Sequence, residues 1–254
     1  MKLLDCTWEN PAENLACDEA LLDAAEAAGG PEVLRFWEPR SHFVVLGYGD
    51  RAEKEVNVAA CKADGVPVLR RSSGGGTVLQ GPGCLNYSLI LKIDPLGPLR
   101  SIVSANRFIM ERNRSAIEAA MNGATLVDTK IPEPSHNRDI SIRGHTDLTL
   151  GELKFSGNAQ RRKKSFLLFH GTFLLRFGLP LLEEYLPLPS RQPAYRFGRS
   201  HSAFVMNLGL PVERVKGALQ AAWNATEPLS APPAEAVTAL VCDKYETNAW
   251  IFRI

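Results

Sequence analysis

Apolar and polar residues alternate along several short stretches of the chain, and this two-residue period predicts β-strands. The clearest stretch is residues 85–91, where an apolar residue occupies every second position and Asn86 and Ser88 lie between them. Other runs rich in β-branched and aromatic residues have similar lengths and are bounded by turn-forming residues. They cover residues 33–37, 43–47, 66–69 and 166–175. The sequence therefore predicts a β-sheet built from short strands.

Stretches with a helical period separate these strands. Asn10 and Pro11 suit the cap and first position of a helix that should end near Ala28, because Gly29 and the next two residues break it. Further helices are predicted over residues 53–64, 102–122 and 211–223. Strands that alternate with helices in this way indicate an α/β (α+β) fold.

A polar segment over residues 128–147 is predicted to be an exposed loop, because it is rich in proline, histidine and charged residues. A hairpin should follow, since the pair Gly151-Glu152 joins two short β-like runs and suits a type II′ turn. Alternation in the second run places Lys154 and Ser156 on one face and Phe155 on the other. A solvent-facing strand residue is the commoner role for such a lysine, and a functional role is the alternative.

Residues 70–79, Arg-Arg-Ser-Ser-Gly-Gly-Gly-Thr-Val-Leu, combine two guanidinium groups, two hydroxyls at the serines and three consecutive glycines between predicted strands. Glycines allow a backbone to approach a ligand closely and to turn its N–H groups toward an anion, and Arg71 offers a planar fork of donors. These features favour a nucleotide or an activated acid as ligand. Three glycines between strands are more often a tight turn or bulge, and the stretch matches neither the P-loop nor the dinucleotide fingerprint. Both interpretations stay open on this stretch alone.

Composition narrows the class of protein. The 254 residues are 45% hydrophobic, which is ample for a large core, and 29 Lys+Arg against 28 Asp+Glu give a net charge of +1. This balance gives no reason to expect nucleic acid or a membrane surface as partner. The five cysteines are scattered without metal-ligand spacing, and no apolar run has the length of a membrane helix or the pattern of a leader peptide. The sequence therefore predicts a cytoplasmic protein.

His170 stands beside Gly171 and Thr172 inside the apolar strand predicted over residues 166–175. A histidine in such a position is more often a hydrogen-bonded structural residue than a catalytic base, and both roles are retained. No serine, histidine and aspartate have a spacing that indicates hydrolysis. The glycine-rich stretch and the hairpin lysine are therefore the main candidates for a site.

Several short segments resemble segments of lipoate-protein ligases and occur in the same order. They are residues 14–22, 34–37, 70–76, 85–88, 147–148, 154–161 and 170–172. The similarity covers most of residues 14–175, and the tail with Asp243-Lys244-Tyr245 and Trp250 also resembles the end of that family's catalytic domain. The resemblance implies the biotin/lipoate-protein-ligase fold, which is class II synthetase-like: a mixed β-sheet with surrounding helices. It also implies a single catalytic domain over residues 1–254, without the large C-terminal accessory domain of longer ligases.

The resemblance implies a two-step reaction. A ligase of this family activates lipoate or octanoate with ATP and Mg²⁺ to an acyl-adenylate. It then transfers the acyl group to a lysine of a lipoyl carrier domain, of the 2-oxoacid dehydrogenase E2 or glycine cleavage H protein type. Lys154 matches the family's invariant lysine and is expected to be catalytic. Both steps place extra negative charge on oxygen, which a fixed ammonium stabilises, and removing one such group typically costs roughly 3–4 kcal/mol of barrier.

Carried over by position, the residues expected to bind ATP or the acyl-adenylate are Arg71, Ser73, Gly74, Gly75, Gly76, Thr77, Val78, Leu79, Lys154, Ser156, Gly157 and Ala159. Asp147 matches the family's aspartate ahead of the lysine strand, and it is expected either to orient Lys154 or to hold Mg²⁺ through its oxygens. His170, Gly171 and Thr172 match a further motif of the site.

The sequence departs from the family pattern in the acyl pocket and in length. Gln80-Gly81 stands where many members have His-Asp, and Thr146 replaces a usual asparagine, so neither the length of the acid nor its dithiolane is fixed by the resemblance. The arginine- and serine-rich residues 191–201 either fold over the adenylate or form a solvated loop. Because the accessory domain is missing, the chain either works alone or needs a separate accessory subunit.

Two other functions fit the same fold. An octanoyl or lipoyl transferase acts without ATP and in some branches uses a cysteine nucleophile, but the usual position of that cysteine, near Asp139, holds none. Cys84 is interpreted as a strand or pocket residue unless its thiol pKa is depressed. A binding protein that captures lipoate or its adenylate without transferring it is the other alternative. Biotin suits the motifs less well, because they resemble the lipoate branch.

Overall fold

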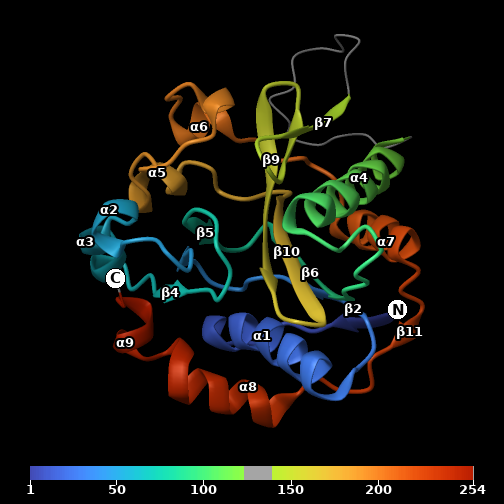
Figure 1. Cartoon of the computed structure of the whole chain (residues 1–254). Helices are drawn as coiled ribbons and strands as arrows, with labels where there is room; N and C mark the ends of the chain where they lie inside the picture. The colour runs from blue at the N-terminus through green and yellow to red at the C-terminus, as the bar shows by residue number, and fades with distance from the viewer. Residues whose placement is uncertain (123–138, 254) are drawn as a thin grey trace.

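The computed structural model describes residues 1–122 and 139–253, and a mixed β-sheet of eight strands runs through it (Figure 1). Across the sheet the strands follow the order β11 (Glu227–Pro228), β1 (Lys2–Asp5), β2 (Val33–Trp37), β6 (Cys84–Lys92), β10 (Phe166–Leu174), β9 (Leu153–Arg162), β8 (Asp147–Leu150) and β7 (Ile140–Arg143). β1 pairs in parallel with β2 and β11, and the other neighbours pair antiparallel. A smaller sheet joins β4 (Val68–Arg70), β3 (Phe43–Leu46) and β5 (Val78–Gln80). The mixed-sheet α/β fold expected from the sequence is confirmed.

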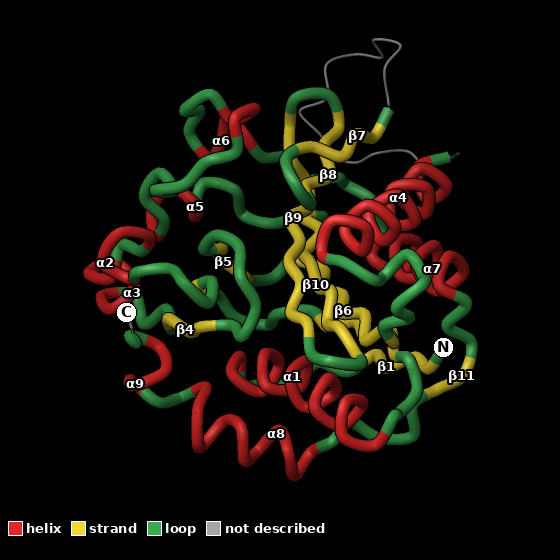
Figure 2. Tube along the Cα trace, viewed as in Figure 1, coloured by secondary structure: helices red, strands yellow, loops and turns green. Residues whose placement is uncertain are grey.

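Helices cover both faces of the large sheet (Figures 1 and 2). One face packs against α1 (Pro11–Ala28) and the smaller sheet, with α8 (Ala234–Leu240) on the outer side of α1. The other face packs against α4 (Ile102–Met121) and α7 (Val212–Trp223). Each face has its own buried apolar cluster, so the central strands are buried on both sides. The short helical elements are α2 (Ala52–Glu55), α3 (Val58–Ala63), α5 (Leu181–Tyr185), the 3-10 turn η1 (Ala194–Arg196), α6 (His201–Phe204), the π-turn η2 (Val241–Tyr245) and α9 (Asn248–Ile251).

Strand β6 shows how the sheet separates the two cores. Leu85, Tyr87 and Leu89 belong to the cluster under α4 and α7. Ser88 points to the opposite face and donates to Asp18 Oδ2 on α1 at 2.7 Å. The alternation read from the sequence is therefore confirmed, and the polar face of β6 lies toward α1.

Helix α1 begins and ends where the sequence predicts. The side chain of Asn10 accepts from the N–H of Ala12 at 3.0 Å, Pro11 fills the first position, and Gly29 ends the helix with a φ of 65°. Because α1 lies between the sheet and α8, several of its polar side chains are buried, Asp18 among them. Among the described residues, no helix has the length and apolar character needed to cross a membrane.

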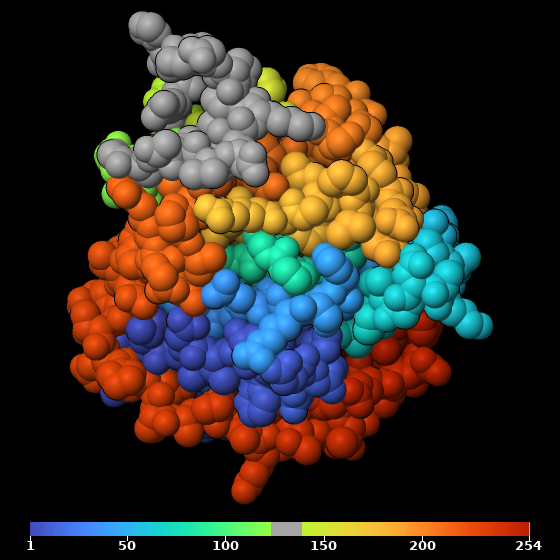
Figure 3. Space-filling model, turned by 180° about the vertical axis from the view of Figure 1, so that it is seen from behind, coloured from blue at the N-terminus to red at the C-terminus, as the bar shows by residue number. Residues whose placement is uncertain are grey.

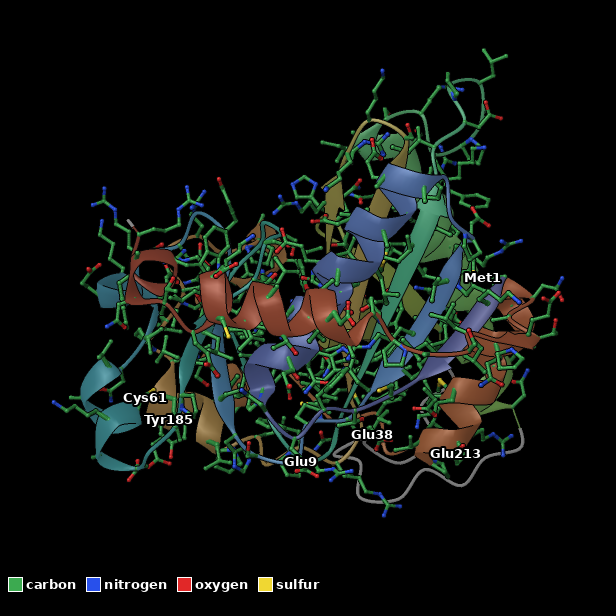
Figure 4. All side chains as sticks on the ribbon, turned by 90° about the horizontal axis from the view of Figure 1, so that it is seen from below. Met1, Glu9, Glu38, Cys61, Tyr185 and Glu213 are labelled. Carbon is green, nitrogen blue, oxygen red and sulfur yellow. The ribbon has the colours of Figure 1, made fainter. Side chains whose placement is uncertain are left out.

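The helix predicted over residues 53–64 is in fact two short helices, α2 and α3. The chain is extended at Val56, and the side chain of Asn57 caps the start of α3. α3 packs against α5, where Cys61 and Tyr185 lie side by side (Figure 4). Seen from behind, the amber segment after β10 runs to these cyan helices (Figure 3), and the side chain of Asn57 donates to Glu184 O at 3.1 Å. The helical period continues through residue 56, but the extended Val56 and the Asn57 cap end one helix and begin the next, and the Glu184 contact holds this junction.

Three other segments differ from the sequence prediction. Part of the loop predicted over residues 128–147 forms the edge strand β7 and the start of β8, while residues 123–138 lie outside the described residues. The segment after residue 225, for which no helix or strand was predicted, contains β11 and the helices α8 and α9. β1 was not predicted at all. Lys216 of α7 ties that helix to β1, because its Nζ lies 3.0 Å from Asp5 of β1 and 2.9 Å from Glu38. Figure 4 labels Glu38 beside α7.

Candidate functional site

The glycine-rich stretch forms the loop between β4 and β5, as predicted. Arg71 is buried, and its guanidinium folds back on this loop. Nη2 donates to the carbonyl oxygens of Gly74 at 2.6 Å and Gly76 at 2.8 Å, and Nε donates to Ser73 Oγ at 3.1 Å. Burial lowers the pKa of Arg71 to about 10, which leaves it protonated at neutral pH. Arg71 therefore shapes the loop from within, where the sequence suggested a direct fork of donors to a ligand.

The carbonyl oxygens of Gly74 and Gly76 point inward to Arg71, which leaves the N–H groups of the loop free to bind a ligand. Within the described residues, the N–H groups of Gly74, Gly75 and Gly76 donate to no protein acceptor. All three glycines are exposed, and Gly75 has a φ of 87°, a conformation that favours glycine. Consecutive unpaired N–H groups on exposed backbone suit an anionic ligand such as a phosphate.

Neighbouring segments hold the loop in this shape. Gly47 lies so close that a Cβ there would come within 1.9 Å of Gly75 O. Asp50 Oδ2 accepts from the N–H of Gly47 at 3.2 Å and from Thr77 Oγ1 at 2.9 Å. The Thr77 hydroxyl, expected to bind the ligand, therefore serves the loop itself.

Arg70 anchors the base of the loop on the C-terminal tail. Its Nε donates to Ile251 O, and its Nη1 donates to Gly47 O and Asp50 O, each at 2.8 Å. Trp250 Nε1 returns a bond to Arg70 O at 2.9 Å. The tail is therefore part of the scaffold of this site.

A bulge sets the orientation of Lys154 on the predicted hairpin between β8 and β9. The register pairs Leu148 with Ser156 but Thr149 with Lys154, so β9 carries one extra residue, Phe155. Lys154 and Ser156 therefore lie on opposite faces. The prediction that they share a face is wrong, because a strict two-residue period does not allow for a bulge.

The Lys154 ammonium is fixed by Asp147. Nζ lies 2.7 Å from Asp147 Oδ1, and the Tyr195 hydroxyl donates to Asp147 Oδ2 at 2.7 Å. Burial and the charge of Asp147 raise the pKa of Tyr195, so its hydroxyl keeps the proton it donates. The Lys154 side chain is 26% exposed, so a ligand can reach it. Tyr195 belongs to the loop over residues 191–201, which therefore packs against the hairpin.

This geometry bears on the predicted magnesium site. Both carboxylate oxygens of Asp147 bond protein groups, which favours its orienting role toward Lys154 over a role as metal ligand. No cluster of three or more metal-ligating side chains occurs in the part of the chain that the structure describes.

Strand β9 brings the ammonium and the glycine loop together. A Cβ on Gly157 would come within 2.8 Å of Lys154 Nζ, and one on Gly75 would lie 3.7 Å from Ala159 Cβ. Gly157 and Ala159 share a face and are about 7 Å apart along the strand. Of the residues expected to bind the adenylate, the glycines, Lys154, Gly157 and Ala159 therefore converge. Ser156 and Leu79 are buried in the interior, and Val78 is exposed beside the loop.

Sequence reasoning missed a line of hydrogen-bonded side chains beneath the loop. Ser73 Oγ lies 2.6 Å from His170 Nε2, and His170 Nδ1 lies 3.1 Å from Asp18 Oδ2. Asp18 also accepts from Arg35 Nη1 at 2.6 Å and from Ser88. Burial opposes its charge, but Arg35 and the bonds from His170 and Ser88 hold the pKa of Asp18 below its usual value. A carboxylate only accepts, so Nδ1 carries a proton, and in a neutral ring Nε2 is then the nitrogen that accepts from Ser73.

Gly171 and Thr172 serve polar networks of the sheet. A Cβ on Gly171 would fall 1.7 Å from Asn158 Oδ1, so only glycine leaves room for that side chain. Thr172 Oγ1 accepts from Gln80 Nε2 at 2.7 Å and donates to Asn86 Oδ1 at 2.5 Å. Asn86 in turn donates to Gln80 Oε1 at 3.0 Å. Gln80, which replaces a histidine of the family motif, is therefore tied into the sheet.

The buried thiols are not activated. Burial raises the pKa of Cys84 to about 12 and that of Cys17 to about 11. Both groups are therefore neutral at physiological pH and unsuited to act as nucleophiles. This supports the interpretation of Cys84 as a strand residue.

The fold and the site together define a class of protein: a mixed-sheet α/β domain in which an exposed glycine loop lies beside a lysine fixed by a carboxylate. The chain belongs to the family described as the lipoyl protein ligase A/B catalytic domain, whose model matches residues 10–222. The family that the sequence motifs indicated is confirmed.

Relatives of the chain carry two kinds of name. The lipoate-protein ligase A subunit 1 of Thermoplasma acidophilum is 26% identical, over 95% of this chain and 92% of the relative. The octanoyltransferase LipM of Symbiobacterium thermophilum is 29% identical, over 83% of this chain and 80% of the relative. A crystal structure of lipoate-protein ligase A bound with ATP matches with a TM-score of 0.78 and 25% identity, over 99% of this chain and 98% of that one. The chain is thus similar to both ligases and transferases.

Proposed function

We propose that this chain is a lipoate-protein ligase that activates lipoate or octanoate with ATP and passes the acyl group to a lysine of a lipoyl carrier domain. The observation that carries the proposal is the Lys154 ammonium, which Asp147 fixes at 2.7 Å next to Gly157 on β9, the strand whose Ala159 lies against the exposed glycine loop. A cation in a fixed position stabilises negative charge that develops on a reacting oxygen without reorganising at that moment.

The glycine loop and Lys154 divide the work of this reaction. The unpaired N–H groups of Gly74, Gly75 and Gly76 suit the phosphate of an acyl-adenylate, and the buried Arg71 cation adds positive charge beneath them. Lys154 stands next to this loop along β9, where it meets the acyl end of the same molecule. It stabilises the phosphate oxygens while the adenylate forms and the carbonyl oxygen while the carrier lysine attacks.

Two observations favour the adenylate route over transfer through a cysteine. The relative bound with ATP shares the fold over nearly the whole chain. The buried Cys84 next to the loop has a raised thiol pKa, and no cysteine occurs between residues 85 and 241. Transfer without ATP remains the competing function because of the octanoyltransferase relatives. A protein that only binds its ligand has no need for the ammonium, carboxylate and hydroxyl relay at Lys154, Asp147 and Tyr195.

We infer two protein partners. The first is the lipoyl carrier domain that presents the acceptor lysine. The second is a separate accessory polypeptide, because the relative named subunit 1 matches this chain over 92% of its own length. Residues 1–254 then act as one catalytic domain. Magnesium as the companion of ATP, the lack of nucleic-acid or membrane partners and the cytoplasmic location stay predictions.

The test is acylation of a purified lipoyl domain, followed by intact-protein mass spectrometry. Wild type with ATP and lipoate should modify the domain, Lys154→Ala should not, and Lys164→Ala is a control because that lysine is exposed on the turn after β9. Each assay is run with and without a candidate accessory subunit. Modification that is independent of ATP, or that survives Lys154→Ala, would contradict the proposal.

A further inference from the structure

We propose that Ser73 is a second acyl acceptor: it takes an acyl group directly from a thioester, with His170 as its base and Asp18 as the residue that orients His170. The inference rests on the acyl class of substrate in the proposed function, but it requires neither ATP nor an adenylate. It assigns a covalent acyl-enzyme to a family member whose buried Cys17 and Cys84 have raised thiol pKa values.

The arrangement has the parts of an activated nucleophile. The hydroxyl, the imidazole and the carboxylate form one line, with 2.6 Å from Ser73 Oγ to His170 Nε2 and 3.1 Å from His170 Nδ1 to Asp18. Such a set is recognised by geometry and roles, whatever its order in the chain. The three residues come from α1, the glycine loop and β10, so the fold alone assembles them.

The carboxylate end of the line is rigidly placed. Asp18 is 2% exposed, and it is held by Arg35, which is itself fully buried, and by Ser88. This fixes the tautomer in which Nε2 faces Ser73 and can take its proton. It also places a negative charge where an imidazolium would form during the attack.

Ser73, at the other end of this line, lies next to N–H donors for the oxyanion that develops during the attack. The N–H groups of Gly74, Gly75 and Gly76 follow Ser73 directly and donate to no acceptor within the described chain. A Cβ added to Gly74 or Gly76 would meet no atom within 4 Å, so the exposed backbone of these residues is open to a ligand, whereas the Ser73 side chain before them is 1% exposed. Arg71 Nε donates to Ser73 Oγ at 3.1 Å, and its positive charge favours the alkoxide character of that oxygen.

Acyl transfer through Ser73 needs only the thioester, the carrier amine and His170. Ser73 Oγ attacks the thioester carbonyl carbon, and its proton passes to His170 Nε2. The carbon–sulfur bond breaks, the thiol leaves with the proton from His170, and an octanoyl ester on Ser73 remains. An amine of the carrier domain then attacks the ester carbonyl carbon and gives a proton to His170 Nε2. The carbon–oxygen bond to Ser73 breaks, Ser73 Oγ takes that proton from His170, and an amide on the carrier remains. No oxidant, reductant or nucleotide is needed.

The experiment incubates the whole chain with octanoyl-coenzyme A in the absence of ATP and measures intact mass, followed by peptide mapping. One octanoyl group on Ser73 is expected in wild type, and none in Ser73→Ala. The neighbouring Ser72→Ala is the matched control and should keep the adduct. His170→Gln should slow its formation by roughly 10²–10⁴-fold, the usual contribution of a general base. An adduct resistant to neutral hydroxylamine distinguishes an oxygen ester from a thioester on cysteine.

Ser73→Cys keeps the inference falsifiable if the alanine variant fails to fold, because a thiol in the same relay should be acylated faster and become sensitive to hydroxylamine. No adduct on wild type, or an adduct that maps to another residue or persists in Ser73→Ala, would overturn the inference. ATP–pyrophosphate exchange on the same preparation separates the two proposals. Exchange without an adduct removes only the role of Ser73, and an adduct without exchange removes only the adenylate route.

Discussion

Gly157→Ala should separate activity from stability. A Cβ at this position would lie 2.8 Å from Lys154 Nζ and 2.9 Å from its Cε, whereas ordinary contacts begin at 3.4 Å. The ammonium must therefore move by at least about 0.6 Å, away from the 2.7 Å contact with Asp147. A misplacement of about 1 Å at a reacting centre can cost about 10²-fold, so acid-dependent ATP–pyrophosphate exchange should fall roughly 10- to 100-fold.

Stability should hardly change in the same variant. The atoms that the new methyl group meets are the far end of a flexible side chain, and Gly157 has no positive φ that would strain alanine. The partly exposed ion pair that is lost contributes about 0–1 kcal/mol. The free energy of unfolding measured in urea should therefore change by less than about 1 kcal/mol. Gly217→Ala on an exposed position of α7 is the control, with full activity and a small gain in stability. Wild-type turnover in a folded Gly157→Ala protein would refute the placement of Lys154.

Tyr195→Phe removes the hydroxyl that donates to Asp147 Oδ2. It should lower kcat about 5- to 20-fold with little change in KM, because the lost hydrogen bond contributes about 1–2 kcal/mol to orienting Asp147. An unchanged kcat would exclude a positioning role. The lowered pKa of Asp18 means that its contribution to stability is present above about pH 3.9 and is lost as the pH falls through its folded pKa. Asp18→Asn leaves the buried Arg35 without its charged partner and should lower the free energy of unfolding by about 3–5 kcal/mol at neutral pH. It should also reduce the loss of stability on acidification in urea unfolding, and an unchanged loss would contradict this. Cys84, whose thiol pKa is raised by burial, should react with thiol reagents only after unfolding, which peptide mapping of the native protein tests directly.

Sequence patterns predicted the parts of the fold that are set by residues close to one another in the chain. The alternation in residues 85–91 gave the two faces of β6 correctly, because each face packs against its own core. The two ends of α1 were also predictable from the sequence, because Asn10 and Gly29 hydrogen-bond backbone groups close to them in the chain. The break at Val56 was not readable, because the contact of Asn57 with Glu184 joins segments distant in the chain.

The site was predictable only in part for the same reason. Resemblance to a family placed Lys154 and the glycine loop, but the bulge at Phe155 moved Ser156 to the other face of the strand. The line from Ser73 through His170 to Asp18 joins residues 97 and 152 positions apart, and no spacing rule reveals such contacts. A signal was present in each residue separately: an aspartate within an apolar helix and a histidine within an apolar strand both need a buried polar partner.

The most direct test of the central claim is ATP–pyrophosphate exchange with lipoate or octanoate, measured on wild type and Lys154→Ala, with the candidate accessory subunit present. Exchange should require the acid and fall by roughly 100-fold or more in the variant, the loss expected for removal of a fixed charge at the reacting oxygen. Exchange that is unaffected by Lys154→Ala, or no exchange from a folded wild-type protein that still acylates its carrier from a thioester, would contradict it.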